Sequence, residues 1–175
     1  MDDPVSKYVP SFEKATVLEK FNEKDSTYTT KPAARGVTVR DLLTHTSGIG
    51  YAQIGSKEAN AIYAKANITA GLNVLDDKLS DAMNRLGPLP LMHNPGEKWT
   101  YGLNTDLLGR LVEIWSGVSL DEFFRKRIFV PLGMNDTYFN LPAEKAGRLV
   151  NFFMEDSLGH LKREKDVLGS TEQFM

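Results

Sequence analysis

Tyr101 is the side chain with the clearest potential for chemistry, because of the residues that flank it. Pro95 and Gly96 predict a turn ahead of it. After it, apolar residues recur with the period of one helix face: Leu103, Leu107, Leu108, Leu111, Val112 and Trp115. We therefore expect Tyr101 on a tight turn at the start of an amphipathic helix, which would present its phenol rigidly to a cleft.

Tyr101 also has an ordinary structural interpretation. A half-buried tyrosine whose hydroxyl makes a local hydrogen bond is common in globular domains. Two polar residues that follow it also fit the start of a helix, Asn104 as the N-cap and Asp106 as a first-turn acid that interacts favourably with the helix dipole. The local residues alone leave the catalytic and the structural interpretation open.

Three segments resemble the serine β-lactamase and penicillin-binding-protein superfamily, nearest to its class C-like β-lactamase and esterase branch. They are VTVRDLLTHTSG at 37–48, PGEKWTYGLNTDLLGRLVE at 95–113 and PLGMNDT at 131–137. The second resembles the block around the family's catalytic tyrosine, and all three follow the family's order. The resemblance implies a mainly α chain with small β additions, namely the helical subdomain of the β-lactamase/transpeptidase-like fold.

The chemistry that this resemblance implies is acyl transfer by a serine. In the family, a serine with a lysine three residues later attacks an amide or ester carbonyl and forms an acyl-enzyme. The tyrosine moves the proton, and nearby cations favour its phenolate, since an ordinary phenol has a pKa of about 10. Tyr101 matches that catalytic tyrosine. Residues 2–10 resemble the segment after the nucleophile-bearing helix, so we expect the Ser-x-x-Lys segment to lie upstream of Met1.

Two positions bear on the substrate. Many members of the family have Tyr-x-Asn, whose amide contacts the substrate, whereas here Leu103 follows two residues after Tyr101 and Asn104 comes next. Tyr-x-Leu resembles esterase-type members, which favours an ester over a β-lactam. Asn104 is a candidate substrate-binding residue in place of the missing amide, beside its N-cap interpretation. Lys145 and Gly147 match the family's Lys-x-Gly strand by letters, but Pro142 predicts a short exposed helix there, so we interpret the match as chance.

The histidines do not predict a metal site. His45, His93 and His160 are far apart and have no neighbours at ligand spacing, so we expect no metal and no cofactor. We expect the side chain of His45 to interact with the last carbonyls of a helix that ends beside it. Trp99 and Trp115 are expected to anchor the core.

Short helices and a hairpin should position these residues. The expected helices cover 39–46, with a capping box at Thr38 and Asp41, 57–66, 76–86, and Ser119 to about Phe129 with Phe123, Phe124 and Ile128 buried. A hairpin is expected near 15–30, and short strands at 137–139 and 149–154. We expect a helical subdomain over 1–155 and a loose polar tail over 156–175.

Composition excludes several classes of protein. The chain has 175 residues, 41% of them hydrophobic and 25% charged, which indicates a folded domain. Its net charge of -2 and the lack of a basic cluster argue against a nucleic-acid partner. No apolar run approaches the ~20 residues that span a bilayer. The absence of cysteine leaves the localisation open.

Two functions remain. In the first, the chain is the tyrosine-bearing helical part of a serine hydrolase that acts on a small ester or amide, β-lactams included. The nucleophile and the oxyanion hole would lie in an α/β domain outside this chain, so the chain alone should be inactive. In the second, it is a non-catalytic helical binding module on the same scaffold, whose exposed apolar surface docks a partner.

Overall fold

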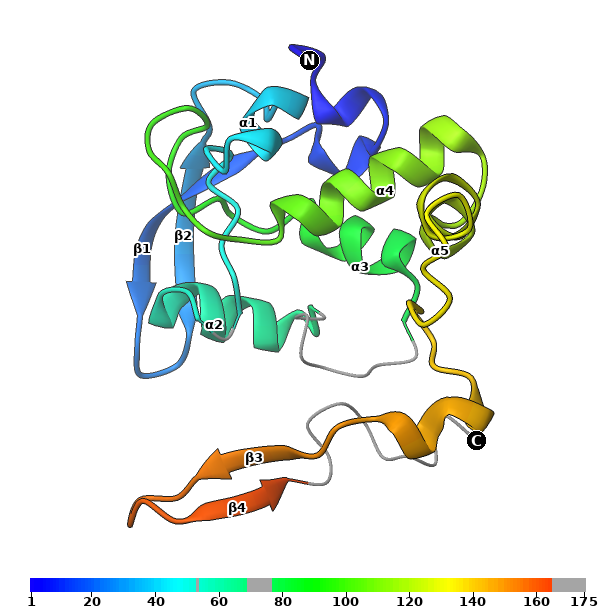
Figure 1. Cartoon of the computed structure of the whole chain (residues 1–175). Coiled ribbons are helices and arrows are strands. Elements are labelled where there is room, and N and C mark those ends of the chain that lie inside the picture. Colours follow the sequence, from blue (N-terminus) through cyan, green and yellow to red (C-terminus); the bar gives the residue numbers. More distant parts are fainter. Residues whose placement is uncertain (53, 69–76, 165–175) are drawn as a thin grey trace. The chain divides into compact units, whose positions relative to one another are not determined.

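The structure is a computed structural model that describes residues 1–52, 54–68 and 77–164 (Figure 1). These residues form two compact units. The first holds the described residues up to Leu120, and the second begins at Asp121. Among the described residues, no helix is long and apolar enough to cross a membrane.

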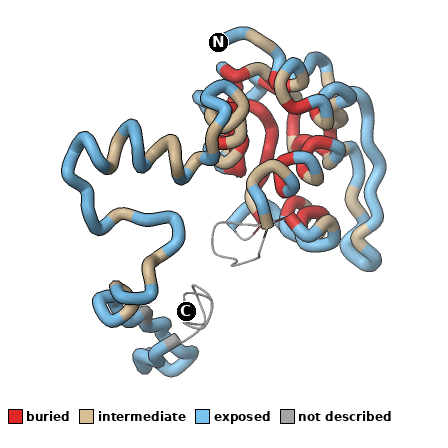
Figure 2. The backbone as a smooth tube through the Cα atoms, turned by 90° about the vertical axis from the view of Figure 1, so that its right-hand side faces the viewer, coloured by how far each residue is buried: buried red, intermediate tan, exposed pale blue. Residues whose placement is uncertain are grey.

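The first unit contains the elements that surround Tyr101. They are the 3-10 turns η1 (Val5–Lys7) and η2 (Pro10–Phe12), strands β1 (Thr16–Asn22) and β2 (Thr27–Pro32), and helices α1 (Val39–Leu43), α2 (Lys57–Lys65), α3 (Leu79–Leu86) and α4 (Asn104–Ser116). Helix α4 packs on both α1 and α3 (Figure 1). Leu103, Leu107 and Leu111 are fully buried along its inner side, which confirms the helical period read from the sequence. Figure 2 shows the buried backbone positions gathered in this unit.

Strands β1 and β2 form the expected antiparallel hairpin. Thr16 pairs with Pro32 and Asn22 with Thr27, and the register shifts once between Leu18 and Lys20. On its other edge, β1 meets the segment after α3: Leu18 N–H donates to the Leu91 carbonyl, and Leu91 N–H donates to the Thr16 carbonyl, both at 2.8 Å. The hairpin thereby fixes the start of the segment that leads to Tyr101.

Helix α1 begins where the sequence predicts and ends earlier. The capping box of Thr38 and Asp41 is present in both directions. The helix was expected to continue to Thr46, but it ends at Leu43 because His45 adopts a left-handed φ of 55°. His45 N–H donates to the Leu42 carbonyl and Thr46 N–H to the Asp41 carbonyl. This is a Schellman termination with histidine in the position that glycine usually takes.

The second unit is an extended series of short elements. It contains the rest of α5 (Leu120–Phe124), the π-helical turn η3 (Arg125–Phe129), the 3-10 helix η4 (Ala143–Arg148), and strands β3 (Phe152–Glu155) and β4 (Leu161–Glu164), which pair with each other. Phe123, Phe124 and Ile128 were expected to be buried and are only half-buried in this unit.

Several expected boundaries differ from the structure. Residues 137–139 form no strand, and the strand expected at 149–154 starts at Phe152. Helix α3 starts at Leu79, later than predicted; Asp76 lies outside the described residues. Part of the segment expected to be loose from Asp156 onward forms β4. The remainder, from 165, also lies outside the described residues.

Candidate active site around Tyr101

Two loops carry the candidate site, and backbone hydrogen bonds join them along their length. One loop is 45–50, after α1, and the other is 91–103, before α4. Four bonds connect them: Met92 N–H to Gly48 O at 2.7 Å, Gly96 N–H to Thr46 O at 2.8 Å, Thr100 N–H to His45 O at 2.8 Å and Leu103 N–H to Gly50 O at 3.2 Å. Two motifs about 50 residues apart in the sequence are thus held side by side.

Glycine is required where these loops approach most closely. A Cβ added to Gly102 would lie 2.0 Å from the Ile49 carbonyl oxygen. At Gly48, which has a φ of 86°, a Cβ would lie 2.3 Å from the His93 carbonyl oxygen. Side chains at these two positions would push the loops apart.

Tyr101 lies at the surface of this paired-loop region. Its side chain is 49% exposed, so it is not sealed in the core. The His45 ring stacks on it, with centroids 5.6 Å apart and planes at 9°, and the rings of Tyr51 and Trp99 approach at 5.5 Å and 6.4 Å. Its hydroxyl makes no hydrogen bond to any residue that the structure describes. The local hydrogen bond expected of a purely structural tyrosine is therefore absent from this part of the chain.

Two buried polar side chains, Asn104 and Ser47, form a series of hydrogen bonds that ends at Nδ1 of the His45 ring. Asn104 Nδ2 lies 3.1 Å from His45 Nδ1, and Ser47 Oγ donates to Asn104 Oδ1 at 2.5 Å. Ser47 Oγ in turn accepts from Ile49 N–H at 3.0 Å. Ser47 and Asn104 are both fully buried. The Ser47 hydroxyl and both polar atoms of the Asn104 amide therefore each have at least one hydrogen-bond partner within the protein.

These contacts correct two expectations. Asn104 is not the N-cap of α4: the cap position is Leu103, and Asn104 is the first helical residue, with its amide directed to Ser47 and His45. The side chain of His45 bonds this amide and not a helix carbonyl. Direct contact between Asn104 and a substrate would require its amide to leave these two hydrogen bonds.

An ion pair between the buried Asp41 carboxylate and the exposed Arg35 side chain anchors the loop that carries His45. Asp41 accepts two bonds from the Arg35 guanidinium, at 2.6 and 2.8 Å, and bonds from the backbone and hydroxyl of Thr38. Thr46, next to His45, also donates to it at 3.3 Å. Burial by itself would raise the pKa of Asp41, but the hydrogen bonds from Arg35 and Thr38 outweigh it and lower the pKa to about 2.

The side chain of His93 forms hydrogen bonds with two other residues of its own loop, 91–103. It is almost fully buried, with Nδ1 2.9 Å from its neighbour's carbonyl, Asn94 O, and Nε2 2.8 Å from Thr100 Oγ1. A carbonyl can only accept, so Nδ1 carries a proton; in the neutral ring, Nε2 then accepts from the Thr100 hydroxyl. Spacing gave no sign of this role, because Thr100 is an unremarkable residue in the sequence.

The remaining candidates near the site are structural or exposed. Asp106 lies in the first turn of α4, as expected, and burial raises its pKa. Trp99 and Trp115 were predicted to anchor the core, and this is wrong: their side chains are 65% and 52% exposed. Trp115 instead meets Tyr8 edge-on, with centroids 5.3 Å apart.

The Ser-x-x-Lys pattern, which we expected only upstream of Met1, occurs once by letters within this sequence, at Ser11 and Lys14. The geometry argues against a nucleophile there. Ser11 Oγ is buried and has no hydrogen-bond partner among the described residues. It is packed so closely on the end of α3 that a Cβ added to Gly87 would lie 2.3 Å away. A hydroxyl in that position has no base and no access to a substrate carbonyl.

The Lys-x-Gly match is also explained. Lys145 and Gly147 lie in the 3-10 helix η4 and not in a strand, as expected for a chance match. Lys145 forms an ion pair with Asp136 and donates to the Asn135 carbonyl at 3.2 Å. These contacts are internal to the second unit.

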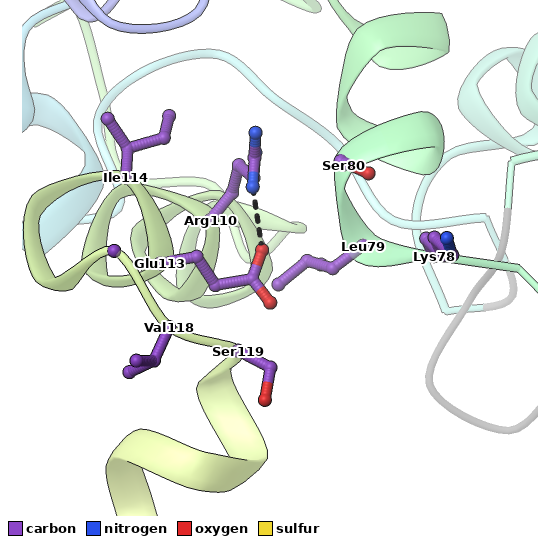
Figure 3. A pocket seen from close by; sticks show the side chains of 9 residues that line it. Lys78, Leu79, Ser80, Arg110, Glu113, Ile114, Val118 and Ser119 are labelled. Carbon is purple, nitrogen blue, oxygen red and sulfur yellow. Dashed lines mark hydrogen bonds and ion pairs between the residues drawn. The ribbon is translucent and has the colours of Figure 1, made fainter.

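Described residues of the first unit also line hollows away from Tyr101. One, of about 630 Å³, lies between the start of α3 and the end of α4 (Figure 3). Arg110 and Glu113, which line this hollow, form an ion pair at 2.9 Å (Figure 3). Another, of about 400 Å³, is mainly apolar and is lined by Tyr8, Leu43, Leu108 and Trp115, among others. In the described part of the chain, no group of three or more His, Asp or Glu residues is arranged to hold a metal ion.

Comparison with known proteins gives this site a family context. Residues 1–165 match the family model described as Beta-lactamase. Esterase EstB of Burkholderia gladioli is 38% identical over 103 residues, which are 59% of this chain and 26% of that protein. The lovastatin esterase of Penicillium rubens is 33% identical over 139 residues, 79% of this chain and 33% of that protein.

Solved structures of similar proteins support the family match. A simvastatin synthase from Aspergillus terreus superposes with a TM-score of 0.72 at 28% identity, covering 95% of this chain and 40% of that one. Together with the family match, this superposition shows that the chain has a β-lactamase-like fold. The chain spans well under half the length of each of these relatives.

Proposed function

This chain belongs to the β-lactamase family, and from that premise we propose that it is the helical, tyrosine-bearing part of a serine hydrolase that works through an acyl-enzyme. Its relatives include esterases, and Leu103 after Tyr101 favours an ester substrate over a β-lactam. The helical subdomain would form one wall of the active-site cleft. An α/β domain outside these residues would supply the serine, the lysine and the oxyanion hole.

One observation supports this assignment most directly. The Tyr101 phenol is half-exposed, its hydroxyl is unbonded within the described residues, and its ring is backed by His45. A proton-transfer group must reach the substrate and keep its orientation. Tyr101 meets both demands from this side of the cleft, and a cationic partner from the other domain would favour its phenolate.

The proposal predicts that the chain alone turns over no substrate. To test this, the isolated chain would be incubated with a p-nitrophenyl ester, a chromogenic cephalosporin and a fluorophosphonate probe. No hydrolysis and no covalent label are expected, because the only Ser-x-x-Lys serine, Ser11, has a buried hydroxyl. Turnover, or a label on any serine of this chain, would contradict the assignment.

The positive arm uses the reading frame extended upstream through a Ser-x-x-Lys segment. That longer protein should hydrolyse the ester, and Tyr101→Phe should lower kcat by about 10²-fold or more. Tyr28→Phe, at an exposed position on β2, is the matched control and should leave kcat unchanged. Equal activity of the Tyr101→Phe variant would remove Tyr101 from the mechanism.

The alternative, a non-catalytic helical binding module, is favoured by one surface. The apolar hollow beside Tyr8 and Trp115 is lined by side chains that are partly exposed in this chain, Leu43 among them. Exposed apolar patches of this kind mark contact surfaces. A gene whose frame begins at Met1 with no Ser-x-x-Lys segment ahead of it would favour the module, whereas an upstream extension favours the enzyme.

A further inference from the structure

We propose that Ser47 and Asn104 select the tautomer of the His45 imidazole that has its proton on Nε2, and that His45 so held is the positioning residue for the Tyr101 ring. The catalytic meaning of this inference rests on the proposed function of Tyr101. The protonation state of His45 does not, and it can be measured in the 175-residue chain itself.

The direction of the hydrogen bonds follows from the atoms at the buried end. Ser47 Oγ accepts from Ile49 N–H at 3.0 Å, so its own proton is free to be donated onward. Its partner lies 2.5 Å away, a separation typical of O–H···O bonds and shorter than the usual N–H···O range. The atom of Asn104 beside Ser47 is therefore the amide oxygen, and the amide nitrogen faces His45.

The amide nitrogen determines the histidine tautomer. Asn104 Nδ2 lies 3.1 Å from His45 Nδ1 and has only protons to offer. Nδ1 must accept, so the ring proton of the neutral imidazole is on Nε2. The other tautomer, with its proton on Nδ1, would place two donors face to face at this part-buried contact, where an unsatisfied donor is costly.

The backbone restrains the same ring independently. The left-handed φ of 55° at His45 is set by the Schellman end of α1, and its carbonyl accepts from Thr100 N–H, one residue before Tyr101. The 9° angle between the two rings follows from both restraints. A ring fixed in this way orients the phenol from behind, and the lysine expected from the other domain would supply the positive charge.

The chain contains its own reference for the test. His93 Nδ1 faces the Asn94 carbonyl, so His93 must carry its proton on Nδ1, opposite to His45. Long-range ¹H–¹⁵N NMR correlations of the histidine-labelled chain would be recorded near pH 8.5, where an ordinary imidazole is neutral. We expect Nε2–H for His45, in roughly tenfold excess over the other tautomer, and Nδ1–H for His93. A His45 signal of the Nδ1–H type in the unmodified chain would overturn the proposal.

Asn104→Asp is expected to reverse the tautomer of His45. The carboxylate keeps the shape of the amide and still accepts from Ser47, but toward His45 it can only accept. The His45 proton should therefore move to Nδ1, while the His93 pattern stays unchanged and reports that the fold is intact. An unchanged His45 tautomer with an intact His93 signal would contradict the inference. If this variant does not fold, the tautomer of His45 measured in the unmodified chain still tests the proposal.

Positioning of Tyr101 has a separate readout. The stacked His45 ring should shift the Tyr101 ring-proton resonances, and His45→Asn should remove that shift, because asparagine tolerates a positive φ but has no ring. The shifts of Tyr8, whose ring meets Trp115 edge-on, provide the control and should not move. Unchanged Tyr101 shifts in His45→Asn would show that His45 does not position the phenol. Neither result depends on turnover, so either can fail while the proposed function stands.

Discussion

The His45 imidazole lies flat against the Tyr101 phenol, with ring centroids 5.6 Å apart and planes at 9°. The two residues are brought together by backbone hydrogen bonds between their loops, the nearest from Thr100 N–H to His45 O. Behind them, the buried side chains of Asn104 and Ser47 hydrogen-bond to each other, and Asn104 also contacts the His45 ring. The exposed phenol therefore stands on a rigid support whose parts come from both motifs.

Gly102→Ala tests how closely the two loops must approach. The added methyl would lie 2.0 Å from the Ile49 carbonyl oxygen, which is backbone and cannot rotate away. We expect a loss of about 1–3 kcal/mol in the free energy of unfolding, together with loss of the His45-induced shift of the Tyr101 ring protons. Urea unfolding and NMR measure the two effects.

Gly36→Ala is the matched control, because a Cβ at Gly36 meets no atom within 4 Å. It should change stability little or raise it slightly by restricting the unfolded chain. Equal effects of the two substitutions would mean that the close approach at Gly102 is unimportant.

Asp41→Asn tests the ion pair that anchors the His45 loop. The folded pKa of Asp41, about 2, is below its usual value of 3.8. Its carboxylate therefore contributes stability that is fully present above about pH 4 and is lost as the pH falls toward 2. At pH 7, Asp41→Asn should lower the free energy of unfolding by about 2 kcal/mol. The difference from the unmodified chain should shrink steadily in unfolding curves recorded between pH 4 and pH 2.

Asp2→Asn offers the comparison for that experiment. Asp2 also pairs with an arginine, Arg40, but this pair is exposed to solvent, and such pairs contribute little. A similar loss in both variants would indicate general charge effects in place of the specific contacts of Asp41.

Local rules were enough for several elements of this chain. The capping box can be predicted because Thr38 and Asp41 are only three residues apart. The buried side of α4 can be predicted from the spacing of its own apolar residues. The β1–β2 hairpin likewise pairs neighbouring segments. Tyr101 was selected by its family block and by the helix after it, and the structure gives it an exposed side chain.

The support behind Tyr101 could not be predicted in the same way. His45 and Asn104 are 59 residues apart, and the N-cap preference of asparagine gave Asn104 a simpler local explanation. The left-handed φ of His45 was missed because glycine, present at position 48, is the usual helix terminator. Ser47 lies in the block at 37–48 that resembles the family, but nothing in its spacing indicates its bond to Asn104, since a buried serine resembles any loop serine until its partner is known.

Tryptophan fluorescence tests the correction at Trp99 and Trp115. Both indoles were expected in the core on the basis of their size, but more than half of each side chain is exposed. In Trp99→Phe and Trp115→Phe, the single remaining tryptophan should emit like a solvated indole and be quenched by acrylamide nearly as well in the folded as in the urea-unfolded chain. Blue-shifted emission with protection from acrylamide would restore the core interpretation.

Two buried serines should respond to alanine substitution with opposite signs. Ser11 Oγ has no hydrogen-bond partner among the described residues, so Ser11→Ala removes an unsatisfied group and should raise the free energy of unfolding by up to about 1 kcal/mol. Ser47 Oγ joins Ile49 N–H to Asn104 Oδ1. Ser47→Ala leaves both of these buried atoms unpaired and should lower the free energy of unfolding by about 1–3 kcal/mol. Parallel urea titrations compare the two directly, and a loss at Ser11 as large as that at Ser47 would mean that the Ser11 hydroxyl has a partner after all.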